Sequence, residues 1–385
     1  MTDLFWPGDH RAGDHLTSAS FAAAMVCVES AWLDVLGHPA DLGGAVGLDA
    51  AEVEAGGNPV IPLVAALRAR LSGEPARWLH RGLTSQDVVD SALMLLLRDA
   101  AADVAGGLRR QVELLAGLAG EHRDTAMVGR TLTQHAVPTT FGLKVATWLT
   151  GVLDAYDDVR RLDFPVQVGG AAGTLAAVVE LGLDPAASGA ALAAGLGLAP
   201  SGPWHTTRRP VTRVGDALVA ATDAWGRIAH DVLTLSRPEI GELTEGAGGG
   251  SSTMPGKANP VLSVLVRRAA LVAPQLGATL HLAAADQCDE RAAGGWHTEW
   301  AALRDLARHA LVAAAQTTDL LTSLRVHPDR MAATLGAART GVLTDVLAEQ
   351  RSMAALAGHD PAGDYLGAAG TLVDSVLTRA QEALR

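Results

Sequence analysis

The sequence predicts an all-α fold built around a bundle of long helices. Hydrophobic residues make up 49 % of the 385 residues and aromatic residues only 4 %, so most of the apolar content is Ala, Leu and Val. Ala and Leu are strong helix formers. Alternating strand patterns are nearly absent, and one apolar stripe with steps of four and three residues runs from Val214 to Leu235. Such a stripe is typical of a helix packed in a bundle.

The first long helix is expected at 86–120. Thr84 or Ser85 suits the N-cap position, because a side-chain oxygen there accepts from the first free amides. Asp87 and Asp90 place negative charge in the first turn, where the helix dipole favours it. The apolar stripe described above marks the second long helix.

Two more long helices are expected further along the chain. The third begins at Asn259 and Pro260, as N-cap and first helical residue, and Pro274 kinks or ends it. The fourth covers 298–325, where leucines and alanines recur at helical spacing. The segments between the helices carry few helix signals, so we expect loops to hold the functional residues.

The length of 385 residues suggests two or three domains. We place an N-terminal helical domain at 1–105 and the central long-helix bundle at 106–326. A small C-terminal helical domain follows at 327–385, after the break that Pro328 marks.

Composition and charge argue against several function classes. The formal net charge is −12 without a long basic run, which argues against nucleic-acid binding. No run of about 18 apolar residues occurs, so we expect no membrane-spanning helix. The N-terminus lacks a basic region followed by an apolar segment, so we expect a cytoplasmic protein. Cys27 and Cys288 lack metal-site spacing and are expected to be small core residues.

The stretch GGGSSTMPGKANP at 248–260 is the least helix-like in the chain. A nucleotide-binding P-loop requires glycine at the position of Ser251 and a hydroxyl residue at that of Ala258, so this interpretation fails. A plain linker explains the glycines but leaves the methionine, lysine and asparagine unexplained. The remaining interpretation is a hinged loop that brings two serines to a bound substrate, with Lys257 facing a carboxylate.

This stretch resembles the signature loop of the fumarase/aspartase superfamily, G-S-S-x-M-P-x-K-x-N-P. The resemblance implies a three-domain, all-α fold whose long helices form the core of a homotetramer, with active sites shared between subunits. It implies reversible β-elimination from a small polycarboxylate without cofactor or metal, in which Ser251 transfers the proton α to a carboxylate. Lys257 would supply positive charge beside Ser251, and Ser252, Met254 and Asn259 would contact the substrate. The apolar stripe also suggests helix faces that one chain cannot bury alone.

The segment HRGLTSQD at 80–87 is similar to the family element H-x-G-x-T-S-x-D. The resemblance implies that His80, Thr84 and Ser85 bind substrate, with the Thr-Ser pair holding a carboxylate. Exposed amides and the dipole at a helix N-terminus favour an anion, so the pair is physically suited to this task. The alternative is an ordinary helix N-cap.

The segment GRTLTQ at 129–134 is similar to G-R-T-H-x-Q and implies substrate contacts by Thr131 and Gln134. Leu132 replaces the usual histidine, which helps the leaving group depart in fumarases and adenylosuccinate lyases. Amines and hydroxide need such protonation, whereas a carboxylate, whose conjugate acid has a pKa of about 4, leaves without help. We therefore expect a carboxylate as the departing or attacking group, and an apolar environment around Leu132. His135 is either a donor in the site or a buried histidine.

Further segments resemble the branch of the superfamily that lactonises 3-carboxy-cis,cis-muconate, among them DLFWPGDHRAGD, GGAAGTLAA and ERAAGGWHTEWAALRDL. Thr207 and Arg209 depart from the branch element W-H-T-Q-R-D, which puts the exact substrate in doubt. We assign Arg208 and Arg291 to substrate binding. His297 either contacts substrate or packs.

The expected function is addition or elimination of a carboxylate across a carbon–carbon double bond of a polycarboxylate. The first candidate is lactonisation of 3-carboxy-cis,cis-muconate in aromatic-ring catabolism. The enzymatic alternatives are elimination from nitrosuccinate and an adenylosuccinate-type β-elimination, and a catalytically silent structural homologue is a remote third. The expected partners are the substrate and three further copies of the chain, with neither nucleic acid nor a membrane.

Overall fold

The structure, a computed structural model, describes residues 3–44, 46–246, 249–250, 253–254, 256–361 and 363–385. Its contacts divide the chain into two compact units, each made of three segments. The first unit comprises Met1–Asp103, Val159–Val219 and Ala273–Val312, and the second comprises Val104–Asp158, Ala220–Val272 and Ala313–Arg385. The division into three consecutive domains stays a prediction.

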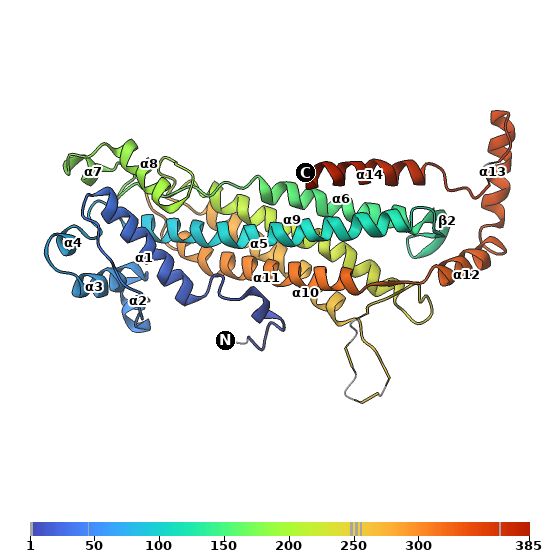
Figure 1. Ribbon diagram of the computed structural model, residues 1–385, viewed down its shortest axis with the longest axis horizontal. Helices are drawn as coiled ribbons and strands as arrows, with labels where there is room; N and C mark the ends of the chain where they lie inside the picture. The colour runs from blue at the N-terminus through green and yellow to red at the C-terminus, as the bar shows by residue number, and fades with distance from the viewer. Residues whose placement is uncertain (1–2, 45, 247–248, 251–252, 255, 362) are drawn as a thin grey trace. The chain divides into compact units, whose positions relative to one another are not determined.

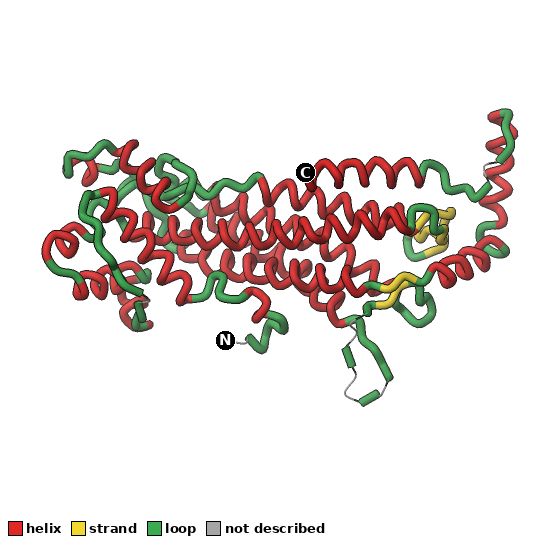
Figure 2. The backbone as a smooth tube through the Cα atoms, viewed as in Figure 1, coloured by secondary structure: helices red, strands yellow, loops and turns green. Residues whose placement is uncertain are grey.

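Helices make up most of the described chain (Figure 2). The labels of the helices follow Figure 1, and a short 3-10 helix, η1, precedes α1 in the chain. The helices are η1 (Asp9–Ala12), α1 (Ser18–Val35), α2 (Ala50–Gly56), α3 (Val60–Arg70), α4 (Gly73–Trp78), α5 (Ser85–Glu121), α6 (Phe141–Arg160), α7 (Ala176–Glu180), α8 (Pro185–Leu196), α9 (Arg209–Leu235), α10 (Val261–Ala285), α11 (Gly295–Ser323), α12 (Pro328–Arg339), α13 (Thr344–Ala357) and α14 (Ala369–Leu384).

The four long helices expected from the sequence are α5, α9, α10 and α11, and each contributes residues to both units. The predicted all-α class is therefore confirmed. Pro274 lies inside α10 and does not end it. In the first unit α1 packs against α8. In the second unit, Trp225 of α9 donates to Gln111 of α5 at 2.7 Å, and Gln111 donates to Ala314 O of α11 at 3.0 Å.

The apolar stripe of α9 is buried within a single chain. Val214 is 1 % exposed and Leu218 2 % exposed in the first unit, and Trp225 and Ile228 are fully buried in the second. A methyl group at Gly226 would collide with Ala270 of α10, so these helices approach closely. The inference that this stripe needs another subunit to cover it was therefore wrong.

The described strands form two small antiparallel sheets, both in the second unit. Strands β1 (Ala126–Thr131) and β2 (Gln134–Thr140) form a hairpin, and β3 (Leu243–Thr244) pairs with β4 (Arg325–Val326). The hairpin register pairs Thr131 with Gln134. The segment GRTLTQ, which the sequence did not mark as strand, is therefore the tip of a hairpin.

The expectation that both cysteines are core residues was wrong, because Cys27 and Cys288 are exposed. Two described helices, α1 and α10, are long and apolar enough to cross a membrane by length and composition alone, a criterion that the core helix of a soluble protein also meets. Within the most apolar 18-residue stretch of each helix, 44 % is buried in α1 and 28 % in α10. The low burial of α10 marks an apolar helix face that the single chain leaves open.

Candidate functional site

The predicted site residues fall into two groups, one in each unit. The first unit holds His80, Thr84, Ser85, Arg208, Arg291 and His297. The second holds Thr131, Gln134, Met254, Lys257 and Asn259. Ser251 and Ser252 lie outside the described residues.

Arg291 and Thr84 meet at the start of α5 in the first unit, and the group that they form with Ser85 is called the anion cradle for the ligand that it would suit. Arg291 Nη2 donates to Thr84 Oγ1 at 2.9 Å and to Ala171 O at 3.2 Å. Arg291 Nε is buried without a hydrogen-bond partner among the described residues. A buried guanidinium donor without an acceptor is costly. A guanidinium, a hydroxyl and the positive end of a long helix therefore converge here, which suits a carboxylate ligand.

Asp87 holds this cradle in place, although it was not among the predicted site residues. Its carboxylate is fully buried and accepts from four donors, each at 2.9 Å. The donors are the amides of Thr84, Gly169 and Gly170 and the Nε2 atom of His205. A side chain at position 169 would collide with His205, so this close approach requires glycine. Asp87 thus joins α5 to the glycine-rich loop that follows residue 168.

The assignment of Arg208 to substrate binding needs correction. Its side chain is fully buried, and it contacts Asp90 and Glu299 at 2.7 Å each. Trp296 Nε1 also donates to Asp90, at 3.0 Å. The guanidinium is therefore occupied by carboxylates of its own chain. It stabilises the junction of α5, α9 and α11 in the first unit.

The charges of this cluster do not balance, because two carboxylates share one guanidinium. Burial raises the pKa of Glu299, and hydrogen bonds from Arg208 oppose that increase. Burial lowers the pKa of Arg208, but the charge of Asp90 and the bonds to both carboxylates outweigh it, so the pKa lies above its ordinary value. The cluster is a stabilising network whose strength depends on pH.

His80 and His297 have different environments. His80 Nδ1 lies 2.6 Å from Glu29 Oε1, and Glu29 is fully buried. His297 Nε2 donates to Gly57 O at 2.9 Å, and its ring lies 4.7 Å from that of Trp300. These contacts of His297 support the packing alternative, although its side chain is exposed.

The hairpin tip carries Thr131, Leu132, Gln134 and His135, and all four are exposed. Leu132 is 95 % exposed, so the expectation that it packs in an apolar environment was wrong for the single chain. The alternative that His135 is buried was also wrong. Leu132 and Thr133 have φ values of 49° and 70°, a left-handed turn that Asn-Gly prefers and a β-branched residue resists.

The residue that precedes the hairpin tip forms an ion pair with a buried carboxylate. Arg130 donates to both oxygens of Glu242, at 3.0 and 2.7 Å, and Glu242 is fully buried. The bidentate pair fixes the start of the turn to the chain just before β3. Glu242 has no sequence signal that would have identified it.

The described ends of the signature loop are held together. Gly249 and Asn259 form an antiparallel bridge, with amide-to-carbonyl distances of 2.8 and 2.7 Å. Glu245 is buried and accepts from the amides of Leu262 and Ser263 at 2.8 and 2.9 Å, which caps α10. Lys257 and Met254 are exposed.

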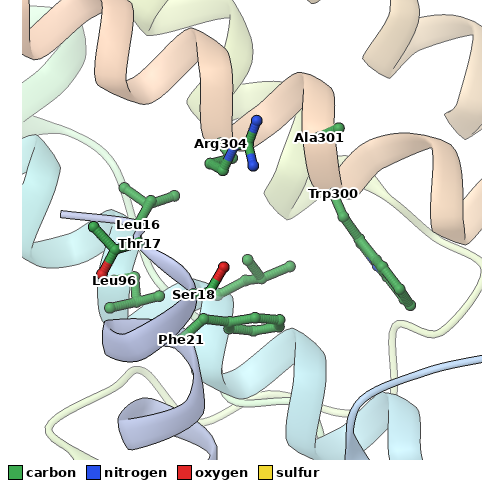
Figure 3. Close-up of a pocket in the computed structure, with 9 residues that line it drawn as sticks. Leu16, Thr17, Ser18, Phe21, Leu96, Trp300, Ala301 and Arg304 are labelled. Carbon is green, nitrogen blue, oxygen red and sulfur yellow. The ribbon is translucent and has the colours of Figure 1, made fainter. Parts of the chain in front are cut away.

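A separate pocket of about 240 Å³ lies in the first unit between the start of α1 and helices α5 and α11. Figure 3 shows Phe21 and Leu96 on its apolar side, with Arg304 and Trp300 contributed by α11. None of the predicted site residues lines it. Among the described residues, no group of three or more His, Cys, Asp or Glu has the arrangement of a metal site.

Comparison with known proteins identifies the family. A family model described as "Lyase" matches residues 49–274, more than half the chain. Nitrosuccinate lyase of Streptomyces davaonensis is 43 % identical over 352 residues, which cover 85 % of this chain and 73 % of that protein. The chain belongs to the fumarase/aspartase superfamily of lyases.

Other members of this superfamily include 3-carboxy-cis,cis-muconate cycloisomerase of Bradyrhizobium diazoefficiens, 42 % identical over 301 residues. The match covers 76 % of this chain and 66 % of that protein, slightly less than two thirds of its length. The crystal structure of 3-carboxy-cis,cis-muconate lactonizing enzyme from Pseudomonas putida superimposes with a TM-score of 0.86 at 28 % identity, covering 97 % of both chains. The superfamily fold expected from the signature loop is confirmed.

Proposed function

We propose that this lyase-superfamily enzyme adds or eliminates a carboxylate across a carbon–carbon double bond of a small polycarboxylate. Lactonisation of 3-carboxy-cis,cis-muconate is the first candidate. The observation that carries the proposal is the hairpin tip, where Leu132 supplies no ionisable group at the position of the family histidine. A carboxylate leaving group needs no protonation, so such a tip is sufficient for this reaction.

In the lactonising direction, a substrate carboxylate attacks one carbon of the double bond. Electron density moves to the adjacent carbon, beside a second carboxylate, and Ser251 delivers a proton there. Lys257 supplies the positive charge that an alkoxide at Ser251 requires. Asn259 and Gln134 stabilise the developing negative charge, as preorganised donors do.

The anion cradle at the start of α5 would hold one substrate carboxylate. Arg291 Nη2 already contacts Thr84 Oγ1 at 2.9 Å, and its buried Nε provides a further donor. Ser85, the first residue of α5, adds a hydroxyl at the helix N-terminus. His80, in the loop that precedes α5, would offer a ring nitrogen to the same substrate carboxylate.

We propose a homotetramer in which the copies complete one another's active sites. The support is the apolar face of α10, where Val264, Leu271 and Leu282 are 52 %, 63 % and 72 % exposed. These residues recur along one side of the helix, so a second helix would bury them together. A cytoplasmic location is proposed with this assembly.

Elimination of nitrite from nitrosuccinate is a second candidate. The observation that favours it is the 43 % identity to nitrosuccinate lyase over 352 residues, a longer match than that to the cycloisomerase. Nitrite resembles a carboxylate in being a good leaving group, so Leu132 is compatible with both reactions.

A substrate panel tests the proposal. Purified enzyme is incubated with 3-carboxy-cis,cis-muconate, nitrosuccinate, fumarate and adenylosuccinate, and the ultraviolet absorbance of each is followed. Turnover of the first supports the cycloisomerase assignment, and turnover of nitrosuccinate alone supports the second candidate. Efficient turnover of fumarate or adenylosuccinate would contradict the leaving-group argument, and no turnover of any substrate would contradict the proposed function.

A further inference from the structure

Glu29 and His80 form a contacting pair, and His80 lies in the loop that precedes Thr84 and the start of α5. Glu29 lies on α1 and is fully buried, whereas the side chain of His80 is 21 % exposed. Glu29 Oε1 lies 2.6 Å from His80 Nδ1, and Glu29 Oε2 is buried without a hydrogen-bond partner among the described residues. A carboxylate removed from water in this way is costly unless a proton or a positive charge compensates it.

The loop that carries His80 is fixed on both sides. Leu79 O accepts from Arg68 Nη2 at 3.1 Å, and Arg81 O accepts from Trp32 Nε1 at 2.6 Å. His80 itself has a φ of 62°, an unfavourable conformation for a residue with a side chain. Such strain persists where the surroundings enforce it, and it occurs at sites that position functional groups.

The contact with Glu29 determines which ring nitrogen of His80 remains available. A carboxylate oxygen only accepts, so Nδ1 carries the proton of this bond. Among the described residues, Nε2 forms no hydrogen bond. With Nδ1 occupied in this way, Nε2 is the ring atom left to contact a substrate carboxylate.

We infer that Glu29 is a positioning residue for the proposed reaction. It holds His80 through Nδ1 and leaves Nε2 to the substrate carboxylate bound at the start of α5. His80 lies four residues before Thr84, in the loop that Asp87 ties to α5 through the Thr84 amide at 2.9 Å. The inference rests on the proposed function and adds to it a residue, Glu29, that belongs to none of the superfamily-like segments.

A double-mutant cycle separates this role from a structural one. Glu29→Gln keeps the shape of the side chain and removes its charge, and it should lower kcat/KM by about 10- to 100-fold. In a His80→Asn background the same change should alter kcat/KM by less than about 2-fold, because the group through which it acts is gone. Asp34→Asn removes an exposed carboxylate of the same helix and serves as the control. An equal loss in both backgrounds would overturn the inference.

Glu29→Asp provides the second comparison. It keeps the charge but leaves a gap in the core, whereas Glu29→Gln keeps the volume. A positioning role predicts that the Asp variant is the more active of the two, and a packing role predicts the reverse order. Circular dichroism and molecular mass confirm that each variant is folded and assembled.

A spectroscopic readout keeps the test independent of turnover. Solid-state ¹⁵N spectra of histidine-labelled wild type, with the His80→Asn variant to assign the signal, should show a protonated Nδ1 at His80. Glu29→Gln should change that signal. An unprotonated Nδ1 in wild type would overturn the inference, whereas absence of turnover together with the expected signal would contradict only the proposed function.

Discussion

Replacing Arg208 by leucine tests the buried cluster in the first unit. The substitution removes the guanidinium that contacts Asp90 and Glu299 at 2.7 Å each and leaves both carboxylates buried. Breaking a buried pair from one side destabilises a protein by about 3–5 kcal/mol, because the remaining charge has no partner. Arg208→Leu should therefore be among the most destabilising single changes in this unit.

The expected loss translates into a measurable shift in melting temperature. An unfolding entropy of about 2.1 cal/mol/K per residue over 385 residues gives about 0.8 kcal/mol/K, so the midpoint should fall by about 4–6 °C. Arg213→Leu on α9, five residues further along the chain, is the matched control. The Arg213 side chain is 40 % exposed, and its Nη1 lies 3.7 Å from Asp163 Oδ2. Its replacement should therefore lower the free energy of unfolding by less than about 1 kcal/mol.

The pH dependence of this loss has a defined sign. Burial raises the pKa of Glu299 above its ordinary value of 4.5, so between the two pKa values the folded state retains a proton that the unfolded state has lost. The contribution of Glu299 to the free energy of unfolding is fully present below pH 4.5, and it is lost as the pH rises through the pKa of the folded state. Removing Arg208 raises that pKa further, so the deficit of Arg208→Leu should be smaller at pH 5 than at pH 8. A midpoint within 1 °C of the Arg213→Leu control at both pH values would refute the reasoning.

Three further predictions follow from the second unit and from α10. Replacing the hairpin tip Leu132-Thr133 by Asn-Gly should raise the free energy of unfolding by about 1 kcal/mol, since both positions have positive φ, and calorimetry checks this. Leu271→Glu should dissociate an assembly of four 39.6 kDa chains in light scattering, whereas Leu372→Glu, 51 % exposed on α14, should not. Leu132→His should leave the melting temperature unchanged because the side chain is 95 % exposed, and it should create no fumarate hydration because the imidazole has no orienting partner. New fumarate hydration in that variant would contradict this.

The long helices were predictable because their signals are local. Each signal lies within a few residues of the helix that it specifies. Examples are Asp87 in the first turn of α5, the stripe of α9 and the Asn259-Pro260 boundary before α10. Helix propensity and the 3.6-residue period act over the same distance. The motifs also located the start of α5 as a candidate site.

The hairpin and the charge clusters were not predictable in the same way. The turn at Leu132-Thr133 uses residues that disfavour positive φ, so local preference pointed away from it. Arg208 suggested a free cation because its partners, Asp90 and Glu299, lie 118 and 91 residues away in the sequence. Only the folded chain shows that the cation is already neutralised.

Asp87 shows a third case, in which the motif was visible but its role was not. It lies in the H-x-G-x-T-S-x-D element but was predicted only as a first-turn acid of the helix, and three of its four hydrogen bonds reach residues more than 80 positions away. Sequence spacing gives no information on such contacts. The exposure of Cys27 and Cys288 was also missed, because composition alone does not show whether a residue faces the core or the solvent.

The most direct test of the account compares wild type with Ser251→Ala and Ser252→Ala in the 3-carboxy-cis,cis-muconate assay. Ser251 is the proposed proton-transfer group, so Ser251→Ala should lower kcat by about 10²–10⁴-fold with little change in substrate affinity or melting temperature. Ser252→Ala should retain measurable turnover. Near-normal turnover by Ser251→Ala would contradict the proposed mechanism, and loss of turnover in Ser252→Ala alone would transfer the proton-transfer role to that serine.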